Sequence, residues 1–410
     1  MIVVVAAVSA NRSMSGVSRH ASNLVRCLIA RPEVKALHVL VAPWEHNYVG
    51  HAIARVDPRL HIHAVPLKPG TLRRNLWYYK TLPEVARQLR ADVVHVGYPA
   101  PIHGGDAFPC PTVVTLHDLY PYDIPSNFGF PKVLFNRIIL RQALRNASAI
   151  ACVSESTRIR LGRAMPELLS KTVIIYNCVE SAPMAVKPSF VMSWDEKPFI
   201  FCVAQHRRNK NIHLAIRAFE RVLKEGLIDP ETRLLIVGMG GPESSRIYRY
   251  VRDSELTRHI VFASGISDAE MNWCYRNCDL LLIPSSVEGF GLPIAEAQLA
   301  GCRIACSDIP AFREVGGDGC RFVPLGPGAE QRFAAAIVAC LGDDRPVPAR
   351  LPQFMAKHIA KQYVELYMKL SSSSCGEPPK PVEGPRPVET HNTEPFERGP
   401  RGEEPTVVQS

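Results

Sequence analysis

The stretch LLLIPSSVEGFGLPIAEAQLAG, residues 280–301, passes from a short apolar segment through a glycine-containing loop into a helical pattern. Pro293 suits the first helical position, and Gly301 suits the end of that helix. Gly289 and Gly291 let backbone amides approach a ligand closely, and the start of a helix offers unpaired N–H groups and the positive end of its dipole. The stretch therefore predicts a buried strand whose end opens on a site for a phosphate or sugar oxygen.

Short β-branched runs alternate with helical patterns on both sides of this stretch, which is typical of parallel βαβ units. In the second half, strands are expected at residues 199–204, 233–237, 259–263, 280–284 and 303–306, with a helix at 212–224. In the first half, strands are expected at residues 2–8, 38–42, 61–65, 93–96, 113–117, 149–153 and 172–176, with a helix at 16–30. The pattern predicts an α/β protein with two Rossmann-like, doubly wound parallel-sheet domains that face a cleft.

A polar, proline-bearing stretch separates the two halves, and the composition changes again near the C-terminus. The expected division is a first domain at 1–180, a linker at 181–198, a second domain at 199–350, and a helix at 351–370 that packs across the domains. Residues 371–410 are rich in Ser, Pro, Gly and Glu and are expected to be disordered.

The composition of the 410 residues, 46% hydrophobic and 21% charged, is that of a globular protein of two domains. No apolar run approaches the roughly 18 to 20 residues that span a bilayer, so a cytoplasmic location is expected. Residues 1–10 are expected to form a buried strand and not a signal peptide, because the apolar run is short and no basic segment precedes it. The twelve cysteines suit a reducing compartment, and none of their spacings completes a zinc set, so no metal site is predicted.

The formal charge of +9, with an acidic tail, makes the body of the chain basic and favours anionic partners. Nucleotide diphosphates, lipid-linked phosphates and a membrane surface all qualify. Nucleic acid is the weakest of these, because no interleaved aromatic and basic platform is present. Arg137, Arg141 and Arg145 lie at i, i+4 and i+8 on a predicted helix, where they either face anionic lipid at the inner membrane face or form a solvated charged face.

Two glutamates lie at the start of the helix in residues 280–301. Glu296 is about one turn inside the helix, where its carboxylate can accept two hydrogen bonds from a ribose diol, and Glu288 lies in the loop at the same mouth. By spacing alone, both could equally be solvated residues of a capped surface helix.

The stretch resembles the family-4 glycosyltransferases, in which two glutamates separated by seven residues stand within PSxxEGFGLPxxEA. The matching positions are Pro284, Ser285, 288–293, Glu296 and Ala297. In that family the first glutamate contacts the donor sugar and the second the ribose, so the resemblance assigns these roles to Glu288 and Glu296. It also places Gly289, Phe290, Gly291 and Leu292 in the donor-binding loop. The resemblance extends over residues 2–370 and implies the GT-B fold, retention of anomeric configuration, and no essential metal or cofactor.

The basic segment at residues 205–211 lies between a strand and a helix, where its cations can neutralise a diphosphate. The other interpretation is a solvated basic turn. The segment is similar to the Arg-Lys-Asn motif of the family, which makes Lys210 a catalytic residue that assists departure of the nucleoside diphosphate. Asn209 stands where the family often has arginine, so the arginine role falls on Arg207 or Arg208.

His117 and Gly16 are the candidates from the first half. His117 ends a predicted strand at the carboxyl edge of the sheet, where ligands bind, although a lone histidine there also suits a structural role. Family-4 enzymes commonly carry a His-Asp at this point that contacts the donor sugar, so the resemblance makes His117 catalytic. Gly16 opens the first helix, where it lets the backbone reach donor or acceptor, and many relatives have two adjacent glycines there.

The resemblance, together with these features, implies a retaining, metal-independent hexosyltransferase of cell-surface polysaccharide synthesis. It would pass a mannose-like sugar from a nucleoside diphosphate sugar in the second domain to a glycan or lipid-linked acceptor on the side of the first. Two alternatives stay open: a nucleotide-sugar epimerase or glycosidic phosphorylase on the same architecture, and a non-catalytic protein that binds nucleotide sugar or glycan. The donor's base and sugar, the acceptor and the oligomeric state do not follow from the sequence.

Overall fold

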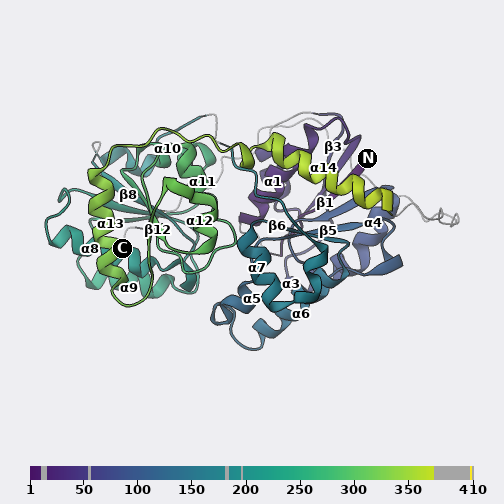
Figure 1. The fold of residues 1–410 in the computed structure, drawn as a ribbon, viewed down its shortest axis with the longest axis horizontal. Helices are drawn as coiled ribbons and strands as arrows, with labels where there is room; N and C mark the ends of the chain where they lie inside the picture. The colour runs from purple at the N-terminus through teal and green to yellow at the C-terminus, as the bar shows by residue number, and fades with distance from the viewer. Residues whose placement is uncertain (11–15, 54–56, 181–183, 195–196, 374–406, 409–410) are drawn as a thin grey trace.

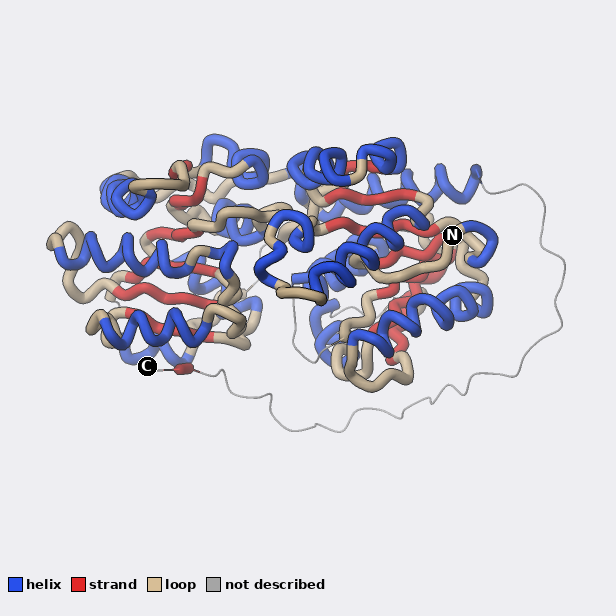
Figure 2. Tube along the Cα trace, turned by 90° about the horizontal axis from the view of Figure 1, so that it is seen from below, coloured by secondary structure: helices blue, strands red, loops and turns tan. Residues whose placement is uncertain are grey.

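The computed structural model describes residues 1–10, 16–53, 57–180, 184–194, 197–373 and 407–408. These residues form two α/β domains that lie next to each other along the longest axis of the molecule (Figure 1). In each domain the strands lie between layers of helices (Figure 2). The predicted class, α/β with two doubly wound parallel sheets, is therefore confirmed.

The first sheet has the strand order β3-β2-β1-β4-β5-β6-β7, with all neighbours parallel. The order reverses between β1 and β4, so the carboxyl ends of these strands form a topological switch point. The strands are β1 (Ile2–Ala6), β2 (Ala36–Val41), β3 (Leu60–Ala64), β4 (Val93–Val96), β5 (Thr112–Leu116), β6 (Ala149–Cys152) and β7 (Thr172–Ile174). The helices are α1 (Gly16–Ile29), α2 (His46–Ile53), α3 (Thr71–Leu76), α4 (Leu82–Gln88), α5 (Tyr120–Asp123), α6 (Lys132–Asn146) and α7 (Glu155–Ala164). A π-helical turn at Trp77–Thr81 and 3₁₀ turns at Gly105–Ala107, Pro125–Asn127 and Pro166–Lys171 complete the domain.

The parallel strands of the second sheet repeat this topology in the order β13-β12-β11-β8-β9-β10, with a switch point between β8 and β11; an antiparallel strand from the C-terminal tail follows β10 at the edge. Its strands are β8 (Phe199–Val203), β9 (Arg233–Val237), β10 (Ile260–Ala263), β11 (Leu280–Ile283), β12 (Ile304–Ser307) and β13 (Arg321–Val323). Its helices are α8 (Ile212–Lys224), α9 (Ser244–Asp253), α10 (Asp268–Asn277), α11 (Leu292–Leu299), α12 (Pro310–Gly316) and α13 (Ala329–Gly342). Short 3₁₀ turns lie at Ser189–Trp194, Arg208–Lys210 and Gly317–Gly319.

Burial on both faces explains why the strands are short apolar runs without polar alternation. Every residue of β4, β6, β11 and β12 is buried, as expected for a parallel sheet covered on both sides. Helix α8 buries Ala215, Ile216 and Phe219 on one face, and full burial of a side chain such as Phe219 contributes roughly 1.5 to 3 kcal/mol. Polar chemistry is consequently confined to the loops at the strand ends.

Helix α14 (Ala356–Ser373) follows the second domain in sequence but packs on the first (Figure 1). Its buried residues Ile359, Tyr363 and Tyr367 belong to the same core cluster as α1 and β1. Just before it, Phe354 lies in a 3₁₀ turn (Pro352–Phe354) within the core of the second domain. The predicted helix at 351–370 thus links the two domains, with its helical part on the first.

The predicted linker and tail are partly described. In the linker, the turn Ser189–Trp194 places Val191 and Trp194 in the core of the second domain, so this part of the connection is packed. In the tail expected to be disordered, residues 371–373 end α14, and β14 (Val407–Val408) pairs antiparallel with β10. The first described segment of the tail thus continues a helix, and the second pairs with a strand. The other residues of the tail lie outside the described ones.

Candidate active site

The loops that follow the carboxyl ends of the strands of both sheets meet between the domains. The loop after β11 carries Glu288, and the turn after β8 carries Lys210. From the first domain, the segment after β5 and the start of α7 contact the same loop. Ligands of open α/β sheets bind at such strand ends, and here two switch points face each other.

The carboxylate of Glu288 is held from both domains. Lys210 donates from Nζ to Oε1 of Glu288, and the Tyr120 hydroxyl donates to Oε2 at 3.2 Å. Burial, followed by the nearby charge of Glu288, raises the pKa of Tyr120 well above its ordinary value, so the hydroxyl keeps its proton. The Glu288 side chain is 11% exposed and that of Lys210 is 20% exposed, so this charge pair is largely withdrawn from water.

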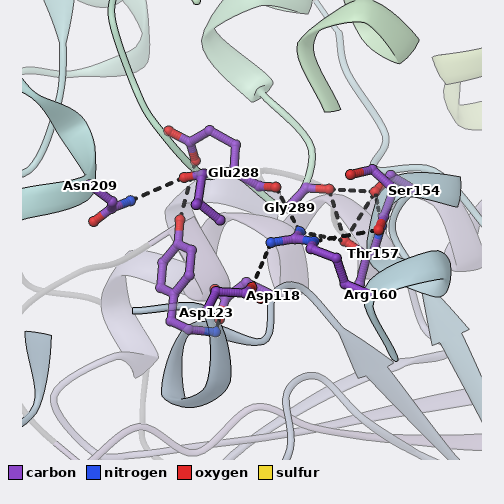
Figure 3. A network of polar contacts seen from close by, with 11 residues as sticks. Asp118, Asp123, Ser154, Thr157, Arg160, Asn209, Glu288 and Gly289 are labelled. Carbon is purple, nitrogen blue, oxygen red and sulfur yellow. Dashed lines mark hydrogen bonds and ion pairs between the residues drawn. The ribbon is translucent and has the colours of Figure 1, made fainter. Parts of the chain in front are cut away.

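Two successive carbonyl groups of the Glu288 loop accept hydrogen bonds from α7 of the first domain (Figure 3). Arg160 donates from Nη2 to the Glu288 carbonyl at 2.7 Å. The hydroxyls of Ser154 and Thr157 donate to the Gly289 carbonyl at 2.5 and 3.0 Å. The contact is so close that a Cβ on Gly289 would lie 1.7 Å from the carbonyl oxygen of His117. Only glycine fits at this position.

The backbone N–H groups of residues 289–292 have no hydrogen-bond partner within the described residues. The N-cap of α11 is Gly291, whose φ of 110° favours glycine and which offers no side-chain cap. A loop with free donors that runs into a helix N-terminus is suited to an anion, because its partial charges point toward the ligand.

Glu296 lies on α11 and faces a different set of partners from Glu288. Arg19, on α1 of the first domain, donates from Nη1 to Oε1 of Glu296 at 3.1 Å and also pairs with Asp268. The Tyr275 hydroxyl donates to the other oxygen of Glu296 at 2.8 Å. The charge of Glu296 raises the pKa of Arg19 above its ordinary value, more than burial lowers it. Both carboxylate oxygens of Glu296 thus accept hydrogen bonds from protein donors, which a diol would have to displace.

His117 is a neutral imidazole, and one of its two ring nitrogens is hydrogen-bonded to the backbone. Its Nε2 lies 2.8 Å from the carbonyl oxygen of Gly97, and a carbonyl only accepts, so Nε2 carries the proton. Burial lowers the pKa of His117 to about 4. At neutral pH its Nδ1 therefore carries a lone pair, which can accept a hydrogen bond from a hydroxyl group. Asp118, the next residue, is half-buried; desolvation raises its pKa, and the charges of Arg160 and Arg207 oppose that rise.

Two family models divide the chain at the same place as the fold. Residues 190–356 match the model described as glycosyl transferases group 1, and residues 14–182 match the model described as glycosyltransferase family 4. The chain belongs to the family-4 (group 1) glycosyltransferases. The resemblance to this family that residues 280–301 indicated is therefore confirmed. The two models together cover the chain except for its termini and a short segment between the domains.

Curated relatives of this family-4 chain include mannosyltransferases. The O-antigen chain mannosyltransferase RfbU of Salmonella typhimurium is 27% identical over 224 residues, which are 55% of this chain and 59% of the relative. The phosphatidyl-myo-inositol mannosyltransferase of Mycolicibacterium smegmatis is 33% identical over 119 residues, which are 28% of this chain and 29% of that protein. The matched regions thus span less than two thirds of the length of either relative.

Solved structures share the fold over nearly the whole chain. Anabaena Alr3699/HepE in complex with UDP-glucose has a TM-score of 0.64 at 17% identity, covering 91% of this chain and 99% of that one. WaaG, a glycosyltransferase involved in lipopolysaccharide biosynthesis, has a TM-score of 0.62 at 16% identity, covering 92% and 100%. At such identities the likeness establishes the fold, which is GT-B as the resemblance implied.

The structure separates the two arginines between which the sequence could not choose. Both line a cavity of about 860 Å³ between α8, α9 and the loop before α13, where Arg217, Arg246 and Arg249 also lie. Arg208 is exposed, whereas Arg207 is half-buried and its charge acts on Asp118 across the interface. Of the two, Arg207 is therefore the one whose charge reaches the interface between the domains.

Asn209, which stands where many relatives have arginine, connects three loops. Its side chain is buried, donates to the Val287 carbonyl at 3.2 Å, and accepts from Asn127 of the first domain at 3.1 Å. A charged arginine side chain would need an anionic partner at this buried position, whereas the neutral amide of Asn209 is satisfied by its two hydrogen bonds. Asn209 thereby helps to fix the backbone of the Glu288 loop.

Three further predictions concern Gly16, metals and membrane-spanning segments. Helix α1 begins at Gly16, but residues 11–15 lie outside the described ones, so a contact of this turn with a ligand stays a prediction. Among the described residues, no group of three or more His, Cys, Asp or Glu side chains is arranged to hold a metal ion. In the same part of the chain, no helix has both the length and the apolar character needed to cross a bilayer.

Sequence reasoning predicted His117 in the first domain but missed other residues that connect the two domains at the site. Tyr120 and Arg160 bind Glu288, Arg19 binds Glu296, and the main-chain N–H groups at the start of α7 are capped by Glu314 of the second domain. Glu314 accepts from the N–H groups of residues 155 and 156 at 2.6 and 3.0 Å. A helix-start pattern is present at 154–157, but nothing local indicates which acid of another domain caps it.

Proposed function

We propose that this chain transfers a hexosyl group from a nucleoside diphosphate sugar to a glycan or lipid-linked acceptor in cell-surface polysaccharide synthesis. One observation carries the proposal: the carboxylate of Glu288 and the ammonium of Lys210 meet in front of a loop whose N–H groups have no partner in the described residues. Paired charges of both signs beside a helix N-terminus suit a ligand that is a sugar at one end and a diphosphate at the other.

Each group has a role in this proposal. Lys210, Arg207 and the N–H groups before α11 would neutralise the departing diphosphate, which removes the need for a metal ion. Glu288 would accept hydrogen bonds from sugar hydroxyls in place of Lys210, and His117 would accept another through Nδ1. Glu296 would bind the ribose diol after Arg19 yields its place.

Retention of anomeric configuration is part of the proposal. Glu288 is held by Lys210 and Tyr120, which suits a residue that orients the sugar more than a nucleophile that attacks it. The departing phosphate would then help to deprotonate the acceptor hydroxyl on the same face of the sugar. Closure of the domains would exclude water and limit hydrolysis of the donor.

The sugar proposed is mannose, and GDP-mannose is the donor to test first. The support is that the curated relatives RfbU and the phosphatidyl-myo-inositol enzyme are named mannosyltransferases. The test is a thermal-shift panel of GDP-, UDP-, ADP- and dTDP-sugars, because binding to the folded state alone adds about 2.7 kcal/mol of stability at a hundred times Kd. GDP-mannose should give the largest shift, and GDP release should rise when acceptor glycolipid is added and persist in EDTA. The absence of a shift with any donor would exclude the proposal, and conversion of the sugar without acceptor would indicate an epimerase.

We also propose a cytoplasmic location with peripheral contact at the inner membrane face, through α6 and Phe130, which lies two residues before it. Phe130, Leu134, Phe135 and Ile138 are 49 to 85% exposed there. The predicted arginine stripe is only partly available to lipid: Arg137 donates to the Pro121 carbonyl at 2.8 Å.

The two remaining arginines of the stripe, Arg141 and Arg145, are about half exposed and share Glu167. The fraction of protein that sediments with phosphatidylglycerol vesicles should fall in the variant Leu134→Ser/Phe135→Ser. It should be unchanged in Val347→Ser, which alters an even more exposed apolar residue outside this surface. Equal sedimentation of both variants would exclude this surface.

A further inference from the structure

Arg160 of the first domain contacts the Glu288 loop of the second through a main-chain atom. Its Nη2 donates to the Glu288 carbonyl at 2.7 Å, and its Nη1 pairs with Asp123 at 2.7 Å (Figure 3). The guanidinium also reaches the hydroxyl of Thr157 at 3.3 Å. The side chain of Arg160 is only 16% exposed and that of Asp123 is 19% exposed.

The hydrogen bond from Arg160 to the Glu288 carbonyl also fixes the direction of the N–H group on the other side of the same peptide unit. Because the peptide unit is planar and trans, the N–H of Gly289 points away from the Glu288 carbonyl. In the same way, the N–H of Phe290 points away from the Gly289 carbonyl, which Ser154 and Thr157 hold. Side chains of α7 therefore set the direction of two N–H groups that have no partner within the described residues.

The pair of Arg160 and Asp123 is a poor source of stability by itself. Removing two charges from water costs about as much as their attraction returns, so a buried pair is weak evidence for a stabilising role. Its guanidinium, however, has several donors in a fixed plane and can bridge Asp123 and the Glu288 loop at once. Arg158 on the same helix offers the contrast: it pairs with Glu155 one turn away and is 37% exposed.

We propose that Arg160 is a positioning residue, which directs the N–H groups of the Glu288 loop toward the leaving diphosphate when the domains are closed. The proposal rests on the function proposed above and deepens it. Tyr120 donates to the carboxylate of Glu288, and Arg160 donates to its main-chain carbonyl. The first domain therefore orients both the side chain and the backbone of a residue that belongs to the second domain.

The test compares Asp123→Asn, Arg160→Met, the double variant Arg160→Met/Asp123→Asn, and Arg158→Gln as a control. The double variant removes both charges of the pair, so it leaves no unpaired charge, whereas Arg160→Met alone leaves Asp123 unpaired. We expect release of GDP from GDP-mannose to fall roughly 10- to 100-fold in kcat in the double variant, because small misplacement of reacting groups has such effects. The Kd for GDP should change less than about threefold, because the nucleoside binds the second domain.

In Asp123→Asn the bond from Arg160 to the carbonyl remains, so the loss should be small, and Arg158→Gln should match the wild type. In a further variant, Arg160→Ala, added guanidinium should partly restore kcat. A double variant with normal kcat, or one whose kcat and GDP affinity fall together, would overturn the positioning role.

Hydrogen exchange of residues 284–296 decides the same question without turnover. Exchange should be faster in the double variant than in Arg158→Gln, because the loop loses one of its anchors. Equal exchange in the two would overturn the proposal. A wild-type protein that binds no nucleotide would instead exclude the proposed function, while the exchange result still decides whether Arg160 orders the loop.

Discussion

Substitution of Gly289 by alanine should separate the two domains at the site without unfolding either. The added Cβ would lie 1.7 Å from the His117 carbonyl oxygen, whereas Cβ atoms essentially never approach other atoms within 3.0 Å. The Glu288 loop and the end of β5 must therefore move apart by more than about 1 Å, and a misplacement of that size can cost about a hundredfold in rate.

The clash lies between two domains that can shift, so we expect the melting temperature of Gly289→Ala to change by less than roughly 2 °C. Release of GDP from GDP-mannose should fall about a hundredfold in kcat, while the Kd for GDP changes little. Gly342→Ala is the matched control, because a Cβ at Gly342 meets nothing within 4 Å. Turnover of Gly289→Ala within about threefold of the wild type would refute the reasoning, because it would mean that the close contact of the domains is not needed for catalysis.

Three other predictions follow from the contacts at the interface and from burial. Lys210→Ala and Glu288→Ala should each lower transfer at least roughly a hundredfold with folding intact, as loss of one oriented charge contact can; near-normal turnover in either would speak against the site. Glu314→Gln should weaken the cap on α7 by about 0.5 to 2 kcal/mol and loosen the closed form, so small-angle scattering should report a larger radius of gyration for it than for the wild type. Burial lowers the pKa of His117 to about 4 and that of His95 to about 3, below the ordinary value of 6.5. Below pH 6.5 the unfolded chain therefore binds more protons than the folded protein, so the free energy of unfolding should be greatest above that pH and fall toward pH 4. Urea unfolding midpoints measured at pH 5 and pH 7.5 can check this. A midpoint that rises on acidification would contradict the assigned neutral state of these histidines.

Much of the fold follows from the sequence because parallel strands are buried on both faces. Apolar runs such as 93–96 and 233–237 can then be located to the residue, as β4 and β9 confirm. The three-residue strand β13 and the short helix α12 were not predicted, because their apolar signal is too brief to be distinguished from a loop.

The part of the site that one domain supplies could also be predicted. Glu288 and Lys210 follow strands β11 and β8, which are neighbours in the sheet, so their loops had to meet. The contacts of Arg160, Tyr120 and Glu314 could not be predicted, because they depend on how the two sheets are oriented relative to each other. No periodicity in either half encodes that orientation.

The position of α14 has a consequence for biosynthesis. The first domain lacks part of its core until residues 356–373 have been made, because Tyr363 and Tyr367 complete the packing around His95. A ribosome therefore releases the second domain before the first can finish folding, which reverses the usual order of N-terminal before C-terminal. A nascent chain that stops short of this helix would expose apolar surface of β1 and α1 to chaperones, and a nonsense mutation near the 3′ end of the coding sequence would damage the amino-terminal lobe first.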